Sequence, residues 1–218
     1  MLRRSYQTIL FDLDGTLTDS GPGIMNGFAY AIRKMGGQVP EREELRKFVG
    51  PTLAVSFREI LGYSPEETDR AIRLYREYYD HLGGVYENTV YPGVGLLLSG
   101  LKASGRKLIL ATSKSARPTD TVLGHFGLRP YFDFVAAGDD QLRPHKIDVI
   151  RHVIAQCGIT DLTQAVMIGD RESDISAAAE AGIDSIGVLY GYGSREELLS
   201  AGATFLAAGV LDLCRILG

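Results

Sequence analysis

The sequence predicts an α/β protein in which a doubly wound parallel sheet carries an inserted all-helical domain. From residue 108 onward, short apolar runs alternate with amphipathic helical patterns. The stretch from residue 20 to residue 87 contains helical patterns only, and the apolar run at residues 8–11 ends in two aspartates. Apolar strands that alternate with helices indicate a parallel sheet with helices on both faces.

Each predicted strand is short, continuously apolar and bounded by Gly, Asp or Ser, as is typical of strands buried on both faces. We expect strands at residues 8–11, 108–111, 134–136, 165–168 and 185–189, with a weaker one at 203–206. The helical patterns around them cover residues 94–103, 117–126, 147–157, 173–181, 195–200 and 210–217. This alternation is the basis for the doubly wound core.

The stretch after the first strand interrupts the alternation. Helical patterns follow one another at residues 22–35, 43–48, 53–61 and 66–81, separated by turns that contain Gly or Pro. We therefore predict two domains. Residues 1–18 and 88–218 form the α/β core, and residues 19–87 form a small helical domain that can cover one edge of the sheet.

Composition excludes several classes of function. The chain has 218 residues, a net charge of −4 and a sequence pI near 5.6, with basic residues scattered among acids. Nucleic-acid binding would require clustered Lys and Arg, and a membrane span would require a longer apolar run. With no signal-peptide pattern and two isolated cysteines, the sequence predicts a cytoplasmic monomer or homodimer without nucleic-acid or membrane partners.

Asp12 and Asp14 stand one residue apart at the end of the first predicted strand. Two carboxylates about 4 Å apart repel each other by roughly 4 kcal/mol at an effective dielectric constant near 20. Such a pair indicates a cation held between the two groups, or a carboxylate that takes part in chemistry. The alternative interpretation is a strand that ends in a solvated acidic turn.

Polar residues also follow two other predicted strands. Thr112 and Ser113 follow the strand at 108–111, and Asp170 follows the strand at 165–168. In doubly wound folds the ligands bind outside the carboxyl ends of the strands. We therefore expect these side chains to meet Asp12 at one edge of the sheet.

Four segments occur in a characteristic order: FDLDGT at residues 11–16, LILATS at 108–113, Lys146 at the start of a helix, and GDRESD at 169–174. This order resembles the haloacid dehalogenase superfamily, specifically its phosphatases with a Rossmann-like core and a helical cap inserted after the first motif. The resemblance covers essentially the whole chain. It is strongest to the phosphoglycolate phosphatase group, which includes members named 5′-nucleotidases.

The resemblance implies a Mg²⁺-dependent hydrolysis of a small phosphomonoester. Asp12 would attack phosphorus and form an aspartyl-phosphate, and Asp14 would protonate the leaving group and then deprotonate water. Thr112 would bind the phosphate through its hydroxyl, and Lys146 would neutralise the phosphoryl group and the nucleophile. General acid–base catalysis of this kind contributes ~10²–10⁴-fold to the rate.

The resemblance also implies the ligands. Mg²⁺ would be held by Asp12, the main-chain carbonyl of Asp14, and Asp170, while Asp174 would hold a metal-bound water or Lys146. Oxygen ligands of this type suit such a hard cation. The remaining residues expected to contact phosphate or substrate are Leu13, Thr16, Ser113 and Gly50.

The third motif departs from the family pattern, because many relatives place a proline directly after the lysine. Here Pro144 precedes Lys146, so either Lys146 or Arg143 occupies the motif position. We favour Lys146, since the fork of arginine is a poor substitute for a compact ammonium.

Two other functions remain as alternatives: a sugar phosphomutase on the same scaffold, and a receiver-like signalling module. The spacing of Asp12 and Asp14 and the helical insert both speak against the receiver module.

Overall fold

A computed structural model describes residues 5–139 and 142–218, so residues 1–4 of the predicted core lie outside the described residues. Within those ranges, six parallel strands form one sheet in the order β5–β4–β1–β6–β7–β8. The predicted fold class is confirmed. The strands are β1 (Thr8–Phe11), β4 (Lys107–Ser115), β5 (Phe134–Gly138), β6 (Ala165–Gly169), β7 (Asp184–Val188) and β8 (Phe205–Ala207).

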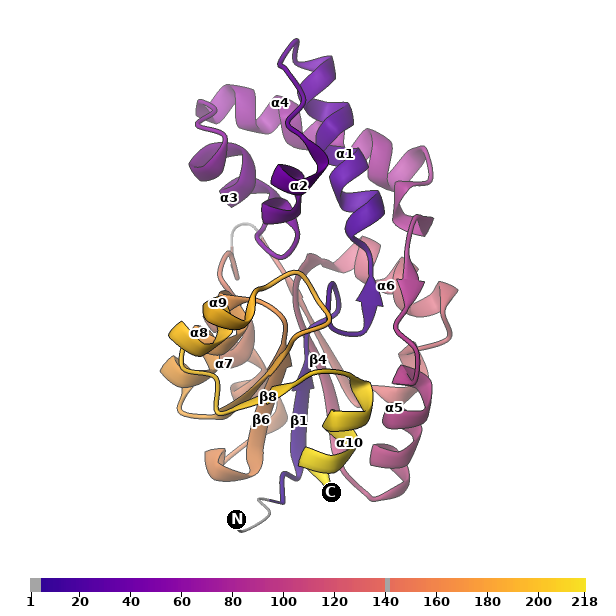
Figure 1. Ribbon diagram of the computed structural model, residues 1–218, viewed down its shortest axis with the longest axis vertical. Coiled ribbons are helices and arrows are strands. Elements are labelled where there is room, and N and C mark those ends of the chain that lie inside the picture. Colours follow the sequence, from indigo (N-terminus) through magenta and orange to yellow (C-terminus); the bar gives the residue numbers. More distant parts are fainter. Residues whose placement is uncertain (1–4, 140–141) are drawn as a thin grey trace.

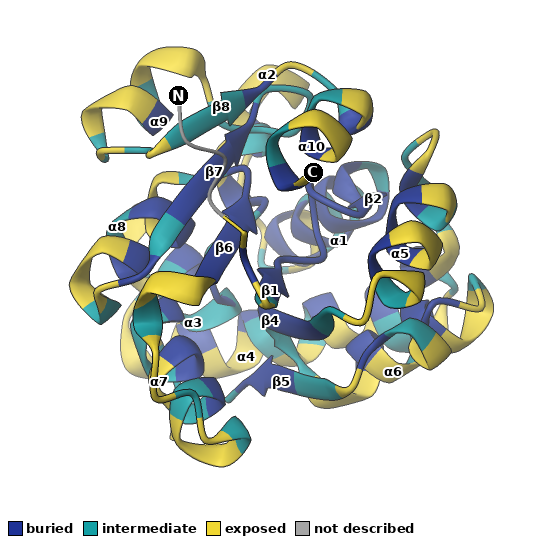
Figure 2. Cartoon of the chain, turned by 90° about the horizontal axis from the view of Figure 1, so that it is seen from below, coloured by how far each residue is buried: buried dark blue, intermediate teal, exposed yellow. Residues whose placement is uncertain are grey.

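Helices cover both faces of the sheet (Figures 1 and 2). Because successive strand residues point to opposite faces, Ile9 and Phe11 pack in one apolar cluster and Leu10 in the other. The first cluster includes residues of α5 (Val94–Ala103), α6 (Ala116–His125) and α10 (Val210–Leu217). The second includes residues of α7 (Lys146–Cys157) and α8 (Glu172–Ala181), and α9 (Arg195–Ser200) lies beside α8. Across the described residues, no helix combines the length and apolar character that crossing a membrane requires.

Residues 20–88, called the helical insertion below, form a layer above the carboxyl edge of the sheet (Figure 1). Phe28 lies at its centre, with ring centroids 4.6 Å from Phe48, 4.8 Å from Phe57 and 5.0 Å from Tyr75. Three of the helices that the sequence predicts as continuous instead change to 3₁₀ or π geometry part-way. The helices are α1 (Gly21–Lys34), α2 (Arg42–Leu45), α3 (Leu53–Val55) and α4 (Pro65–Arg76), and the 3₁₀ or π turns in the insertion are η1 (Arg46–Phe48), η2 (Ser56–Ile60), η3 (Glu77–His81) and η4 (Gly84–Tyr86).

Two short strands that the sequence analysis missed flank the insertion. β2 (Thr18–Asp19) pairs antiparallel with β3 (Thr89–Val90), so the two connections between insertion and sheet lie side by side. Strands of two residues are too short to show an alternating pattern. They lie beside the predicted domain boundaries, and the division into domains 1–18 with 88–218 and 19–87 stays a prediction.

Strand register brings three strand ends to one level. Phe11 pairs with Leu110 on one side and with Ile168 on the other, so Asp12 lies level with the residues that follow those two positions. β4 continues to Ser115, beyond the predicted end at residue 111, with a register shift on the way. Polar groups of the three central strands therefore meet directly beneath the helical insertion.

The central strand gives a stability prediction. Leu10→Ala removes a side chain that is fully buried in β1, so we expect the free energy of unfolding to fall by about 2–5 kcal/mol. Leu96→Ala is the matched control, because the Leu96 side chain in α5 is 84% exposed. Chemical denaturation followed by circular dichroism measures both losses, and equal losses would contradict the described packing of β1.

Candidate active site

Three carboxylates form a compact group at the carboxyl edge of the sheet. Asp12 follows β1, Asp170 follows β6, and Asp174 lies in the first turn of α8. All three are buried, and one oxygen from each lies within 4.8 Å of the others. The arrangement is built from the ends of neighbouring strands, where ligands of doubly wound folds bind.

A tight turn after β1 brings the chain back against this group. The carbonyl of Leu13 accepts hydrogen bonds from the amides of Thr16, Leu17 and Thr18, at 3.3, 2.9 and 3.0 Å. Gly15 has φ +82°, and a Cβ atom there would lie 2.2 Å from Asp170 Oδ2. Both the positive φ and the close approach require glycine at this position.

Asp170 is fixed by hydrogen bonds from two loops. The Thr16 hydroxyl donates to Oδ1 at 3.3 Å, and the Tyr192 amide donates to Oδ2 at 2.8 Å. Burial raises the pKa of Asp170 well above its ordinary value, and the neighbouring Asp174 and Asp12 raise it further. A carboxyl in such surroundings is ionised readily only when a cation is close to it.

Lys146 is the first residue of α7, and its ammonium lies among the carboxylates. Nζ is 2.8 Å from Asp12 Oδ1 and 2.8 Å from Asp174 Oδ1, and it donates a hydrogen bond of 3.0 Å to the Ala111 carbonyl. Burial alone would lower the pKa of Lys146, but the charges of Asp12 and Asp174 outweigh it and raise that pKa. The ammonium therefore remains charged inside the site.

Arg143, the alternative at the third motif, lies elsewhere. Its main chain pairs with Asp139, and its Nε donates to the Ala137 carbonyl at 3.1 Å, near the end of β5. Thus Lys146, and not Arg143, contacts Asp12 in this structure.

Asp14 is turned toward a second lysine that the sequence analysis missed. Lys114 Nζ lies 3.0 and 3.2 Å from the two carboxylate oxygens of Asp14 and 2.8 Å from the Tyr79 hydroxyl. The signal in the sequence was a cation directly after Ser113, one residue beyond the second motif. The hydroxyl of Tyr79, a residue of the helical insertion, also reaches this site.

The charges in the site do not balance. Lys114 and Lys146 are the cations that form ion pairs with Asp12, Asp14 and Asp174, and Arg171, which attracts Asp170, is itself paired with Glu197; a formal charge of −2 is left among these described groups. Burial raises the pKa of Asp12 to about 6, and Asp174 also raises it, although Lys146 opposes the shift. One divalent cation would neutralise the excess, and the buried carboxylates are the oxygen donors that a hard cation prefers.

The remaining predicted residues lie around this centre. Thr112 is buried in β4, and its hydroxyl accepts a hydrogen bond from the Lys114 amide at 3.2 Å. Ser113 and Gly50 line the cleft between the insertion and the sheet. Leu13 is in the apolar cluster on one face of the sheet, so only its main chain faces the turn after β1.

A second contact between insertion and sheet was also missed by the sequence analysis. Arg171, which directly follows Asp170, donates from Nη1 to the Val49 carbonyl and from Nε to Glu197 at 2.9 Å. Its stem lies against Gly50, where φ is +114°. This contact holds the loop around Gly50 above the carboxylate group.

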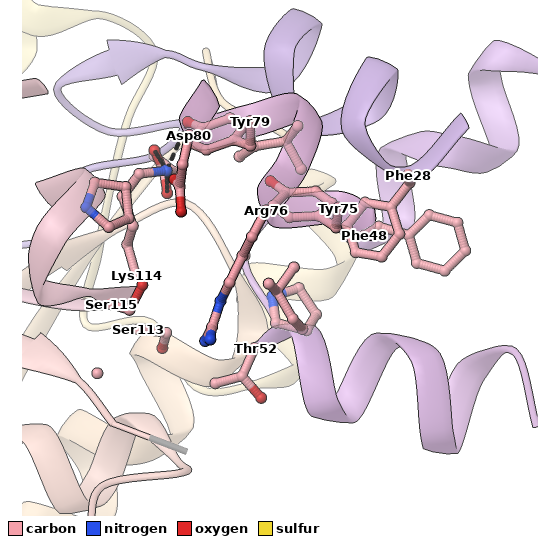
Figure 3. Close-up of a pocket in the computed structure, with 17 residues that line it drawn as sticks. Phe28, Phe48, Thr52, Tyr75, Arg76, Tyr79, Asp80, Ser113, Lys114 and Ser115 are labelled. Atoms are coloured by element: carbon pink, nitrogen blue, oxygen red, sulfur yellow. Dashed lines mark hydrogen bonds and ion pairs between the residues drawn. The ribbon is translucent and has the colours of Figure 1, made fainter. Parts of the chain in front are cut away.

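The cleft opens beside Asp14 and encloses about 650 Å³ of space, counted out to the solvent at its mouth. Figure 3 shows Lys114 and Ser113 on the sheet side, and Arg76 extending into the cleft from α4. The wall formed by the insertion is largely apolar or aromatic, and includes Phe28, Phe48, Pro51, Leu53, Tyr75 and Tyr79. A cleft with an apolar wall and a few polar groups at its edge is typical of small-molecule sites.

Comparison with known proteins identifies the family. The family model described as haloacid dehalogenase-like hydrolase matches residues 9–188. The chain belongs to the haloacid dehalogenase-like hydrolases. The predicted membership is confirmed, and so is the prediction that the chain is an enzyme, a phosphatase of this family.

Individual relatives extend over nearly the whole chain. A 5′-nucleotidase of Pseudomonas aeruginosa is 35% identical over 97% of this chain and 96% of its own length. The tyrosine-protein kinase PtkA of Mycobacterium tuberculosis is 38% identical over 98% of this chain and 73% of its own length. The crystal structure of a predicted phosphatase from Clostridium acetobutylicum is 43% identical, covers 97% of both chains and has a TM-score of 0.92.

The raised pKa of Asp12 predicts how Mg²⁺ changes stability with pH. The pKa of Asp12 is about 6 in the folded chain, whereas its ordinary value is 3.8. The protonated carboxyl therefore stabilises the folded state at low pH, and this stabilisation is lost as the pH rises through 6. A divalent cation such as Mg²⁺ would have to displace that proton to bind Asp12. We therefore expect Mg²⁺ to raise Tm by more at about pH 7.5 than at about pH 5.

Differential scanning calorimetry with and without Mg²⁺ measures the two shifts. Asp170→Asn is the control, because it removes a charge from the carboxylate group and should abolish the stabilisation at both pH values. A shift in Tm of the same size at both pH values in the unchanged chain would contradict this account of the site.

Proposed function

We propose that the protein is a Mg²⁺-dependent phosphomonoester hydrolase that acts on a small phosphorylated metabolite through an aspartyl-phosphate. The observation that carries the proposal is the placement of Asp12 and Asp14. Asp12 lies against Lys146 within the carboxylate group, and Asp14 lines the cleft at its edge. The proposed proton donor thus lies at the cleft where a substrate can enter, and the proposed nucleophile lies two residues before it within the carboxylate group.

In the first step, an Asp12 oxygen attacks phosphorus while the bond from phosphorus to the leaving oxygen breaks. Asp14, which is ion-paired with Lys114 in the structure, must take up a proton before this step, and it transfers that proton to the leaving oxygen, so the leaving group departs as an alcohol. Lys146, 2.8 Å from Asp12, offsets the negative charge of the phosphoryl oxygens that approach the carboxylate.

In the second step, Asp14 takes a proton from a water molecule that attacks the aspartyl-phosphate. The bond between phosphorus and the Asp12 oxygen breaks, which restores the carboxylate and releases inorganic phosphate. The same residue therefore serves as acid and then as base, and both carboxyl groups return to their starting states.

The residues that would hold Mg²⁺ are Asp12, the main-chain carbonyl of Asp14, and Asp170, with Asp174 holding Lys146 beside them. When bound, Mg²⁺ supplies positive charge that stabilises the transferring phosphoryl group. The buried group of carboxylates and its excess negative charge support this assignment.

The remaining polar groups would bind the phosphate and the rest of the substrate. Thr112 and Ser113 follow the apolar part of β4, within reach of the edge where Asp12 lies. Thr16 supports Asp170 through its hydroxyl, and the turn that contains it is closed by hydrogen bonds from its own amides to the Leu13 carbonyl. The loop at Gly50 closes the cleft from the insertion side.

A first measurement is phosphate release from phosphoglycolate, nucleoside 5′-monophosphates and hexose phosphates, with and without Mg²⁺. We expect Mg²⁺-dependent release with a preference among these substrates. Asp12→Asn should lower kcat by ~10³-fold or more without unfolding the chain, because it removes the nucleophile. Substantial Mg²⁺-dependent activity in folded Asp12→Asn would remove Asp12 from that role.

The third motif gives a separate prediction. Lys146→Ala leaves Asp12 and Asp174 without their shared cation, so we expect kcat to fall by ~10²-fold or more. Arg143→Ala should leave kcat close to that of the unchanged chain, because Arg143 contacts the end of β5 instead. A larger loss in the arginine variant would assign the motif position to Arg143.

The relative named tyrosine-protein kinase favours a second candidate function, in which the phosphoryl group passes to a hydroxyl other than water. An aspartyl-phosphate can react in either way, and a phosphomutase would use the same step. Incubation with γ-labelled ATP and a tyrosine-containing peptide distinguishes the candidates. Phosphate release from the monoesters with no label on the peptide supports the hydrolase, whereas Asp12-dependent label on the peptide supports the kinase.

A further inference from the structure

We propose that Tyr79 and Lys114 are positioning residues for Asp14, and that the helical insertion thereby holds the proton donor in place. The inference rests on the proposed function and adds to it two residues from opposite sides of the cleft. Lys114 comes from β4, whereas Tyr79 comes from η3 in the insertion. Figure 3 shows the two side chains meeting beside the cleft.

The Lys114 ammonium has an acceptor for each of its three protons. Two are the carboxylate oxygens of Asp14, at 3.2 and 3.0 Å, and the third is the Tyr79 hydroxyl oxygen, at 2.8 Å. The side chains of Lys114 and Asp14 are only 7% and 10% exposed. An ion pair sheltered from water to this degree has a defined geometry, unlike a solvated pair at the surface.

Tyr79 holds the ammonium in two ways. Its hydroxyl accepts the hydrogen bond, and Lys114 Nζ lies 4.6 Å from the centroid of its ring. The side chain is 2% exposed, and its ring stacks on Tyr75 in the aromatic packing of the insertion. Tyr79 is therefore a rigid support, and it belongs to the part of the chain that lies above the sheet.

The contacts form a chain in which Tyr79 acts on Asp14 only through Lys114. Loss of the Tyr79 hydroxyl frees one proton of the ammonium, which can then leave its bidentate position on Asp14. A displaced carboxyl transfers its proton to the leaving oxygen less effectively, because proton transfer requires hydrogen-bond distance. The loss of activity should therefore be larger for substrates whose leaving group must be protonated.

Tyr79→Phe tests this, with Tyr78→Phe as the matched control. Tyr78 is the adjacent residue, and its hydroxyl binds Glu87 away from the site. We measure kcat/KM for an alkyl phosphate, β-glycerophosphate, and for p-nitrophenyl phosphate, whose leaving group departs without protonation. We expect Tyr79→Phe to lower kcat/KM by ~10-fold or more for the alkyl ester and by less than about threefold for the aryl ester.

A double-mutant cycle tests the order of the contacts. Lys114→Met should show the same selective loss on the alkyl ester, and Tyr79→Phe should add little to it in the Lys114→Met background. Tm values of all variants report whether the fold is retained.

Equal losses on the two esters, or additive effects of the two substitutions, would overturn the inference and indicate a structural role. An effect of Tyr78→Phe as large as that of Tyr79→Phe would do so as well. If the unchanged chain released no phosphate from either ester, the proposed function itself would fail, and this inference with it. Full activity of Tyr79→Phe beside an inactive Asp12→Asn would overturn the inference alone.

Discussion

The structure depends on one electrostatic constraint: four carboxylates are buried together at one edge of a sheet. Neither β1 nor β6 could end in an aspartate at this depth without nearby positive charge, because desolvated carboxylates repel each other strongly. Lys146 contributes one cation from the start of α7, and Lys114 contributes another from β4. The excess that remains explains why the site suits a divalent cation, and burial together with the neighbouring carboxylates raises the pKa of Asp12 and that of Asp170.

The two lysines divide the site into halves with different surroundings. Lys146 is enclosed by the sheet and the first turns of α7 and α8, and its three contacts come from the core of the molecule. Lys114 lies at the border with the helical insertion, where Tyr79 completes its contacts. The Arg171 contact to Val49 is a second such link. Asp12, the proposed nucleophile, is thus held by groups of the α/β core, whereas the proposed proton donor Asp14 depends on both parts of the chain.

Much of this arrangement follows from the sequence, because the decisive signals are local. β1, α5, α9 and α10 have the predicted bounds, since the apolar run or helical period that predicts each of them is complete within its own segment. The grouping of Asp12 with Asp170 also follows, because parallel strand ends meet at one edge. Two other features could not be predicted in this way: the pairing of β2 with β3 and the contact of Tyr79 with Lys114. Each joins segments far apart in sequence through very few residues.

The β2–β3 ladder has an evolutionary consequence. Both connections of the helical insertion run through these two paired strands, so the insertion begins and ends at neighbouring points of the core. Substitutions or length changes between residues 20 and 88 can therefore accumulate without altering the order or register of the sheet. Natural selection can reshape the wall of the cleft that the insertion forms while the carboxylates and lysines at the edge of the sheet stay fixed, so one scaffold can give rise to descendants with different substrates.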